Sequence, residues 1–79
     1  MSQIIETLSL LRTVDPICNQ IANDLQMIEE SFRNGEIAAM ERNHLITEIR
    51  DVRVAMECAG NEIAMRYTVQ ACNVLLSVV

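Results

Sequence analysis

The single histidine, His44, stands between two glutamates: Glu41 precedes it by three residues and Glu48 follows it by four. On a helix these three side chains share one face, and imidazole and carboxylate groups are ligands for divalent ions such as zinc. The same spacing is also that of an ordinary solvated helix face, and we favour this second interpretation. We therefore expect the protein to use no metal and no cofactor.

Other catalytic arrangements are missing from the sequence. The four serines have no neighbouring base, and no glycine-rich phosphate loop or cysteine–histidine pair is recognisable. The three cysteines, Cys18, Cys58 and Cys72, are scattered and form no C-x-x-C motif, which indicates reduced, buried thiols in a cytoplasmic protein. We predict that the protein is not an enzyme.

Length and composition indicate one small domain with an aliphatic core. The chain has 79 residues, of which 51% are hydrophobic and 3% aromatic, a composition typical of packed helices. Its net charge is −5, and its six basic residues are arginines that form no basic run, so nucleic-acid binding is not expected. No stretch reaches the roughly 20 apolar residues that span a bilayer, and no secretion signal is recognisable. We expect a cytoplasmic location.

The elements that position the side chains are predicted to be helices. Apolar residues at helical spacing predict a first helix over about residues 3–13. Asp15 followed by Pro16 has the form of an N-cap with proline at the first helical position, which predicts a second helix over about residues 16–33. One continuous helix with a kink at Pro16 is the alternative, and we favour the break.

Asn34 and Gly35 are the clearest turn signal in the chain, because both residues tolerate the left-handed backbone that ends a helix. The pair also marks β-hairpins. Since the flanking periodicity is helical, we predict a helical hairpin with its turn at residues 34–36. A connection this short makes the flanking helices antiparallel neighbours.

A second apolar seam begins after the turn and predicts one long helix over about residues 38–77. Its positions recur in steps of four and three residues, the a/d pattern of a coiled coil. Gly60 lies within this seam, where glycine is about 1 kcal/mol less favourable than alanine; we favour a continuous or kinked helix over a break. The hairpin seam is predicted to join Ile21, Leu25, Ile28 and Phe32 to Leu45, Ile49, Val52, Met56 and Ile63.

The end of the long helix, from residue 67 onwards, extends beyond the first arm of the predicted hairpin and contains no charged residue. An apolar end of this kind is rarely left in water. It either folds back on Ile4, Ile5 and Leu8, if the chain breaks at Pro16, or pairs with another protein chain. We expect a homo-oligomer whose interface is formed by Tyr67, Ala71, Val74, Leu75 and Val78.

The residues around the turn resemble a pattern of small helical proteins of tailed bacteriophages. The matching segments are FRNGEI at residues 32–37, Glu41, and LITEI at residues 45–49, and the similarity covers about residues 25–50. In that pattern GEI forms the bend of a helical hairpin and a serine follows as a helix cap, whereas Ala38 stands here. The resemblance implies a virion component or assembly accessory, in the host cytoplasm or the virion.

These observations predict an all-α fold: an antiparallel helical hairpin with a long C-terminal helix, or a three-helix bundle if the chain breaks at Pro16. The predicted function is that of a non-enzymatic structural or assembly protein that acts through helix–helix contacts with itself or with a larger partner. The alternative is a small acidic regulatory adaptor that binds and modulates a host or cellular protein.

Overall fold

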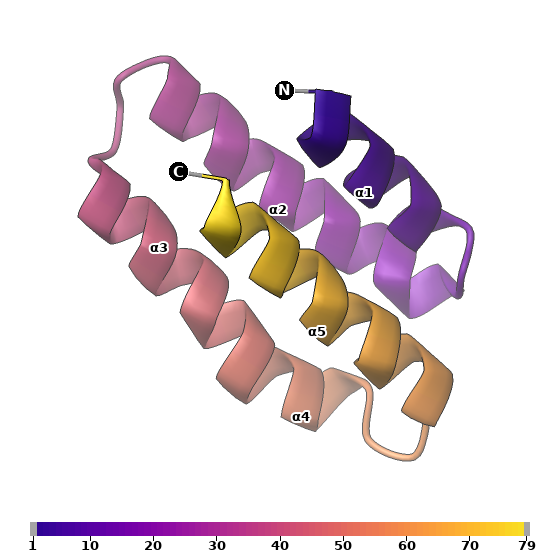
Figure 1. Cartoon of the computed structure of the whole chain (residues 1–79). Helices are drawn as coiled ribbons and strands as arrows, with labels where there is room; N and C mark the ends of the chain where they lie inside the picture. The colour runs from indigo at the N-terminus through magenta and orange to yellow at the C-terminus, as the bar shows by residue number, and fades with distance from the viewer. Residues whose placement is uncertain (1, 79) are drawn as a thin grey trace.

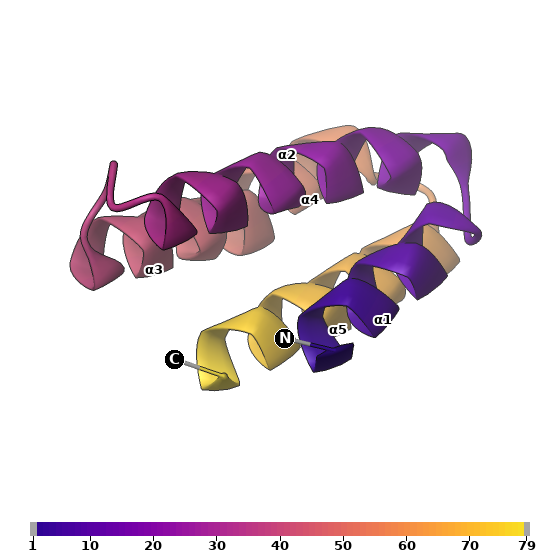
Figure 2. The same cartoon turned by 90° about the horizontal axis from the view of Figure 1, so that it is seen from above.

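The computed structural model describes residues 2–78 of the chain, and these residues form four helical arms that run up and down beside one another (Figure 1). Seen from above, α2 (Pro16–Arg33) and the third arm, which consists of α3, η1 and α4 over residues 39–57, form one layer, and α1 (Ser2–Arg12) and α5 (Glu62–Ser77) form the other (Figure 2). The third arm is continuous but contains a π-helical turn, η1. The elements are α1 (Ser2–Arg12), α2 (Pro16–Arg33), α3 (Ala39–Glu48), η1 (Ile49–Arg53), α4 (Val54–Glu57) and α5 (Glu62–Ser77). The all-α class is confirmed, and no strand occurs among the described residues.

The first break in the chain lies at Asp15 and Pro16, where the sequence favours it. Asp15 has an extended backbone, and its Oδ1 accepts a hydrogen bond of 3.1 Å from the Ile17 N–H. Pro16 occupies the first position of α2, where a missing N–H leaves no intrahelical bond unmade. The Asp15 Oδ2 also accepts a hydrogen bond of 3.0 Å from the Asn61 side chain. Asp15 therefore links the loop before α2 to the loop before α5.

The turn after α2 is a Schellman motif centred on the predicted Asn34 and Gly35. The Glu36 N–H donates to the Ser31 carbonyl at 2.8 Å, and the Gly35 N–H donates to the Phe32 carbonyl at 3.1 Å. Gly35 has a φ of +78°, in the region that only glycine adopts freely. The chain therefore reverses here, and α3 returns beside α2 (Figure 1).

The prediction of one helix over residues 38–77 is wrong, because the chain also breaks between α4 and α5. Gly60 has a φ of +83°, which no residue inside a right-handed helix adopts. Asn61 then caps α5, since its Oδ1 accepts a hydrogen bond of 3.1 Å from the Ala64 N–H. The apolar spacing continues across Gly60, but the backbone reverses direction there.

The substitution Gly60→Ala distinguishes a break from a continuous helix by the sign of its effect. In the observed left-handed conformation, a Cβ lowers the free energy of unfolding by about 1–2 kcal/mol; inside a continuous helix, alanine would raise it by about 1 kcal/mol. No neighbouring atom lies within 4 Å of the added Cβ, so the backbone alone sets the result. Urea unfolding followed by circular dichroism measures it, and Gly60→Asn, which tolerates this conformation better, is the matched control.

The π-helical turn shifts the buried side of the third arm by one residue. Before the turn the buried positions are Arg42, Ile46 and Ile49; after it they are Val54 and Cys58. The step from Ile49 to Val54 is five residues because the Val54 N–H bonds to the Ile49 carbonyl, and a π turn holds one residue more than an α turn. The predicted seam therefore leaves the core after Ile49.

The remaining seam residues are divided between the interior and the surface. Ile21 and Leu25 are fully buried in the core, and Ile28, Phe32 and Leu45 are half-buried. The prediction that the seam continues inside the protein is wrong for three residues that lie exposed on the surface: Val52, Met56 and Ile63.

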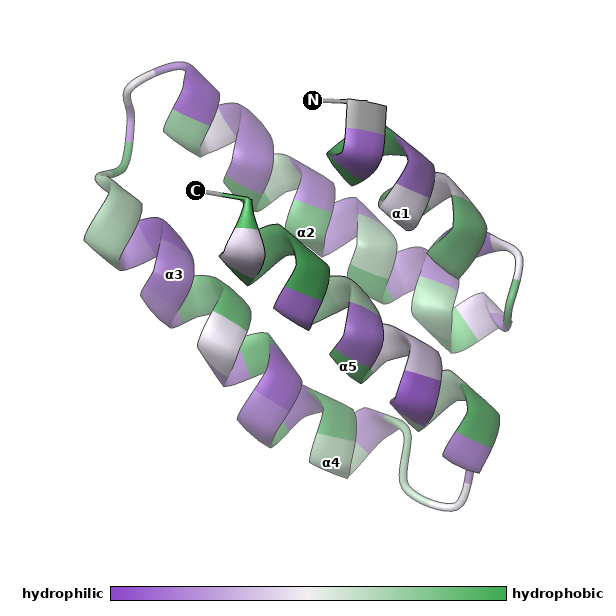
Figure 3. Ribbon diagram, in the orientation of Figure 1, coloured by the Kyte–Doolittle hydropathy of each residue, from purple (hydrophilic) through white to green (hydrophobic). Residues whose placement is uncertain are grey.

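The apolar C-terminal end folds back on the first helix instead of extending beyond the bundle. Because the chain reverses at Gly60, α5 packs on α1, and hydrophobic and hydrophilic residues alternate along both helices as amphipathic packing requires (Figure 3). Ile4 and Leu8 are buried in this contact, as the fold-back alternative predicts, whereas Ile5 is exposed. The core residues that α1 and α5 supply are Ile4, Leu8, Leu11, Ala64, Ala71, Cys72 and Leu75.

Candidate interaction surfaces

One apolar surface lies along α5, beside α1. Ile63, Tyr67 and the half-buried Val74 of α5 lie on one side of the helix together with Val78, the residue at its C-cap. We call these four residues the α5 stripe. Ile63 is 64% exposed and Tyr67 is 41% exposed. Leu10 of α1, 61% exposed, extends this surface, and a shallow groove of about 150 Å³ runs between Leu10, Tyr67 and Val74.

The predicted interface residues do not all lie on this surface. Tyr67 and Val78 are exposed, and Val74 is half-buried along the groove. Ala71 and Leu75, in contrast, are buried inside the protein's own core, because α5 turns that face toward the other helices. Leu75 is therefore not accessible to a partner, and Ala71 contributes only to the lining of the groove, so this part of the predicted interface is wrong.

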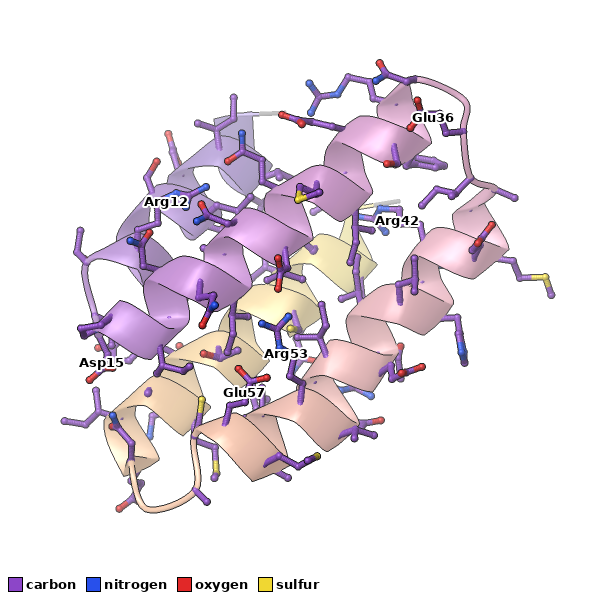
Figure 4. All side chains as sticks on the ribbon, turned by 180° about the vertical axis from the view of Figure 1, so that it is seen from behind. Arg12, Asp15, Glu36, Arg42, Arg53 and Glu57 are labelled. Carbon is purple, nitrogen blue, oxygen red and sulfur yellow. The ribbon has the colours of Figure 1, made fainter. Side chains whose placement is uncertain are left out.

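A second apolar groove, of about 290 Å³, lies on the opposite layer between α2 and the third arm. We call it the α2–α3 groove; Ile28, Leu45, Val52 and Met56 supply its apolar lining. Glu48 and Arg53 also line it. Figure 4 shows Arg53 and Glu57 lying beside each other on this face of the molecule. The flexible Met56 side chain, which lies exposed, suits a surface that adapts to its ligand.

A charged cluster formed by Arg42 and Glu29 lies in the interior. Their exposed fractions are 1% and 5%, so both charged side chains are buried. The Arg42 Nε donates to Glu29 Oε1 at 2.7 Å, and its Nη2 donates to the Leu75 carbonyl at 2.7 Å. The Phe32 ring lies 5.5 Å from the guanidinium carbon. Arg42 thus joins α3 to both α2 and α5 (Figure 4).

Sequence reasoning did not single out Arg42, although its position contains a signal. Arg42 precedes Ile46 by four residues and Ile49 by seven, so it lies on the buried side of the third arm. A buried arginine requires a carboxylate partner, and Glu29 is the acidic residue of α2 that is buried. The cluster is structural, because its donors are already engaged with protein acceptors.

Three further arginines join helices near the surface. Arg12 of α1 donates to the side chains of Asn19, Asn23 and Gln26 on α2. Arg50 of η1 donates to Asp51 and to Asn73 of α5, and Arg53 of η1 donates to Glu57 and to Asp24 of α2. A guanidinium group has several donors in one plane and reaches two acceptors at once. This geometry gives a physical reason for arginine at these positions.

The three cysteines lie in the core and are poorly suited to nucleophilic chemistry. All three thiols are free and fully buried. Burial raises the pKa of the Cys72 thiol to about 11 and also raises the pKa of Cys58. A reactive cysteine needs the opposite shift, because the thiolate is the attacking species. The Cys18 sulfur lies 3.6 Å from the Thr68 hydroxyl oxygen, between α2 and α5.

His44 lies on the outer face of α3, where the sequence places it. Its Nε2 is 3.4 Å from Glu48 Oε2, and both side chains are mostly exposed. Among the described residues, no group of three or more histidine, cysteine or acidic side chains is arranged to hold a metal ion. The pair has the features of a solvated i, i+4 contact.

Comparisons with protein-family models, with curated proteins and with solved structures found no match to this chain. Within residues 2–78, none of the helices is both long enough and apolar enough to cross a membrane.

Proposed function

We propose that this protein is a non-enzymatic helical structural or assembly protein that acts through contacts with other protein chains, and first of all with copies of itself. The observation that supports this proposal is the α5 stripe, where large apolar side chains lie outward beside the exposed Leu10. Removing such side chains from water is favourable by about 25 cal/mol per Å² of apolar surface. The resemblance of residues 25–50 to small phage proteins extends the proposal to a component or accessory of a bacteriophage virion.

The charge distribution also supports self-association through this surface. The chain has a net charge of −5, so two copies repel each other when their acidic faces meet. Between residues 63 and 78, Arg66 is the only charged residue in the sequence. Contact along α5 therefore brings two copies together without placing carboxylates against carboxylates.

Light scattering across a concentration series tests the proposal. The natural protein is expected to form a defined oligomer, and Tyr67→Glu is expected to shift it to the monomer while helical circular dichroism is retained. Met40→Glu is the matched control: Met40 is 82% exposed on α3, in the other layer, and its replacement should leave the molar mass unchanged. A natural protein that stays monomeric at every concentration would contradict self-association.

The second candidate function, a small acidic adaptor that modulates another protein, is favoured by a different observation. The buried face of α5 is satisfied within the chain, so a monomer has a complete core, and the α2–α3 groove offers an apolar surface with Glu48 at its edge. An adaptor of this kind is expected to remain monomeric and to unfold in one cooperative transition at low concentration. The light-scattering series therefore separates the two candidates.

A further inference from the structure

The α2–α3 groove contains an apolar stripe at the spacing of a helix–helix contact. Leu45, Ile49, Val52 and Met56 follow one another in steps of four, three and four residues, and all four line the groove. This is the a/d spacing with which a helix presents a stripe to a partner helix. Val52 is 51% exposed and Met56 is 75% exposed, so the chain's own helices leave this part of the stripe in water.

The π turn accounts for the exposure of these two residues. It adds one residue between Ile49 and Val54, so Val54 continues the buried side of the third arm, while Val52 and Met56 lie outside the core. Single π turns within α-helices are rare and occur frequently at functional sites. The position of the π turn beside the groove therefore favours the groove as a contact for another helix.

The charged side chains at the groove are mostly acidic. Arg53 is the one basic residue in its lining, and it is shared by two carboxylates, Asp24 and Glu57 (Figure 4). Glu48 also lines the groove; it contacts His44 rather than an arginine, and its side chain is 60% exposed. Three carboxylates and one guanidinium group leave two negative charges in excess, which attract a basic partner.

We infer that the α2–α3 groove binds an amphipathic helix of another protein, one that carries lysines or arginines beside its apolar residues. The apolar side of that helix packs on Val52 and Met56, with the i, i+3/i+4 and i+7 spacing of helices that bind in grooves. Its basic residues lie beside Glu48 and the carboxylates around Arg53. The inference rests on the proposed contact with other protein chains, but it does not require self-association.

The charge of the chain disfavours a second copy as the occupant of this groove. Its net charge is −5, so two copies repel each other when an acidic groove is the contact. The helices α1, α2, α3 and α5 each contain a single arginine and no lysine. None of these four helices therefore offers the basic residues that the groove attracts.

Fluorescence anisotropy with two synthetic peptides tests the inference. Each peptide has about 18 residues, enough for an amphipathic helix, with leucine along one side and alanine elsewhere. One carries lysine and the other glutamate at the positions beside the leucines. The lysine peptide is expected to bind with a dissociation constant at least about tenfold lower than that of the glutamate peptide. No binding of the lysine peptide, or equal affinity for both peptides, would overturn the inference.

Charge reversal at Glu48 tests whether the peptide binds at the groove. Glu48→Lys is expected to raise the dissociation constant of the lysine peptide about tenfold and to lower that of the glutamate peptide. Glu62→Lys is the matched control, because it makes the same change of net charge on α5, in the other layer, where the Glu62 side chain is 87% exposed. It should change neither constant by more than about twofold. Equal effects of the two variants would show attraction to the acidic protein as a whole and would overturn the inference.

The apolar part of the contact is tested at Met56. Met56→Gln is expected to raise the dissociation constant of the lysine peptide about tenfold, because an exposed apolar side chain no longer enters the contact. Met40→Gln makes the same substitution at an exposed methionine that does not line the groove and should have no effect. Equal dissociation constants for the two variants would exclude the groove as the binding site.

Light scattering separates this inference from the proposed function. If the natural protein forms an oligomer and the lysine peptide does not bind, the inference fails and the proposed function stands. If the natural protein is a monomer and the lysine peptide binds as described, self-association fails and the inference stands. A Met56→Gln variant that loses self-association would identify the groove as a contact between copies and would overturn the inference.

Discussion

Replacing Arg42 by methionine is expected to lower the free energy of unfolding by about 3–5 kcal/mol, the usual effect of removing one member of a buried ion pair. The methionine has a similar length but no donor. Glu29, 5% exposed, is then left as a buried charge without its partner, and the Leu75 carbonyl loses the hydrogen bond from Nη2. A domain of this size has a total stability of only about 5–10 kcal/mol, so the variant is expected to be at least partly unfolded at 37 °C.

Urea unfolding followed by circular dichroism measures this effect, with two variants for comparison. Arg50→Met makes the same substitution at a partly exposed arginine that contacts Asp51 and Asn73, and a loss of no more than about 1 kcal/mol is expected. The double variant Arg42→Met with Glu29→Leu removes both charges and should recover most of the stability. A single variant that loses less than about 1 kcal/mol would show that the cluster does not hold the helices together.

The Arg42 cluster also accounts for how the two layers are joined. Arg42 comes from the layer of α2 and α3, and it bonds to a backbone carbonyl of α5 in the other layer. An apolar residue would fill this space, but it would not fix how far α5 is shifted along its axis relative to α3. The Nη2 bond to the Leu75 carbonyl fixes that position, because a hydrogen bond requires both distance and direction.

The helix ends could be predicted from the sequence, because they depend on single residues. Asp15 and Pro16 specify the start of α2, and Asn34 and Gly35 specify its end, by backbone preferences that act within a few residues. The outcome at Ala38 agrees with the same reasoning. Ala38 is the N-cap of α3 and makes no side-chain capping bond, as expected from a residue that has no acceptor.

The break at Gly60 could not be separated from a kinked helix by apolar spacing alone. Ala59 and Ile63 continue the periodic pattern across it, yet Ile63 lies on the surface after the chain reverses. The decisive signal was local: Gly60 followed by Asn61 pairs a residue suited to the left-handed conformation with a good N-cap. The break also explains why the observed surface differs from the predicted interface. Because the chain reverses at Gly60, α5 packs in the core with Ala71 and Leu75 buried, and Tyr67 and Val78 are exposed.

The π turn was hidden from sequence reasoning for a different reason. A π turn differs from an α turn in its hydrogen-bond register, and no residue type specifies it. The evidence in the sequence is the wider step from Ile49 to Val54, which becomes visible only once Val54 is known to be buried. The prediction that the seam continues to Val52 and Met56 assumed regular α-helical turns throughout.

Deleting Asp51 is expected to leave the fold intact and to change the free energy of unfolding by no more than about 1 kcal/mol, the range of a surface change. Asp51 is exposed within η1. Its removal places Val54 four residues after Ile49, so an α turn replaces the π turn while Ile49 and Val54 stay on the buried side. Arg53 and Glu57 both follow the deletion, so their i, i+4 contact is retained.

A deletion in a regular helix provides the matched control. Gln20 is an exposed residue of α2, and its removal rotates the two halves of that helix by about 100° relative to each other. Ile21 and Leu25, which are fully buried, then point away from the core, and this protein is expected to lose its cooperative unfolding transition. Circular dichroism and urea unfolding of both deletions make the comparison.

If the Asp51 deletion unfolded like the Gln20 deletion, the π turn would be required by the packing of its neighbours. Near-natural stability of the Asp51 deletion would identify the π turn as a single extra residue that an α-helical arm accommodates. Arg42 before the turn and Val54 after it would then both remain packed in the same core.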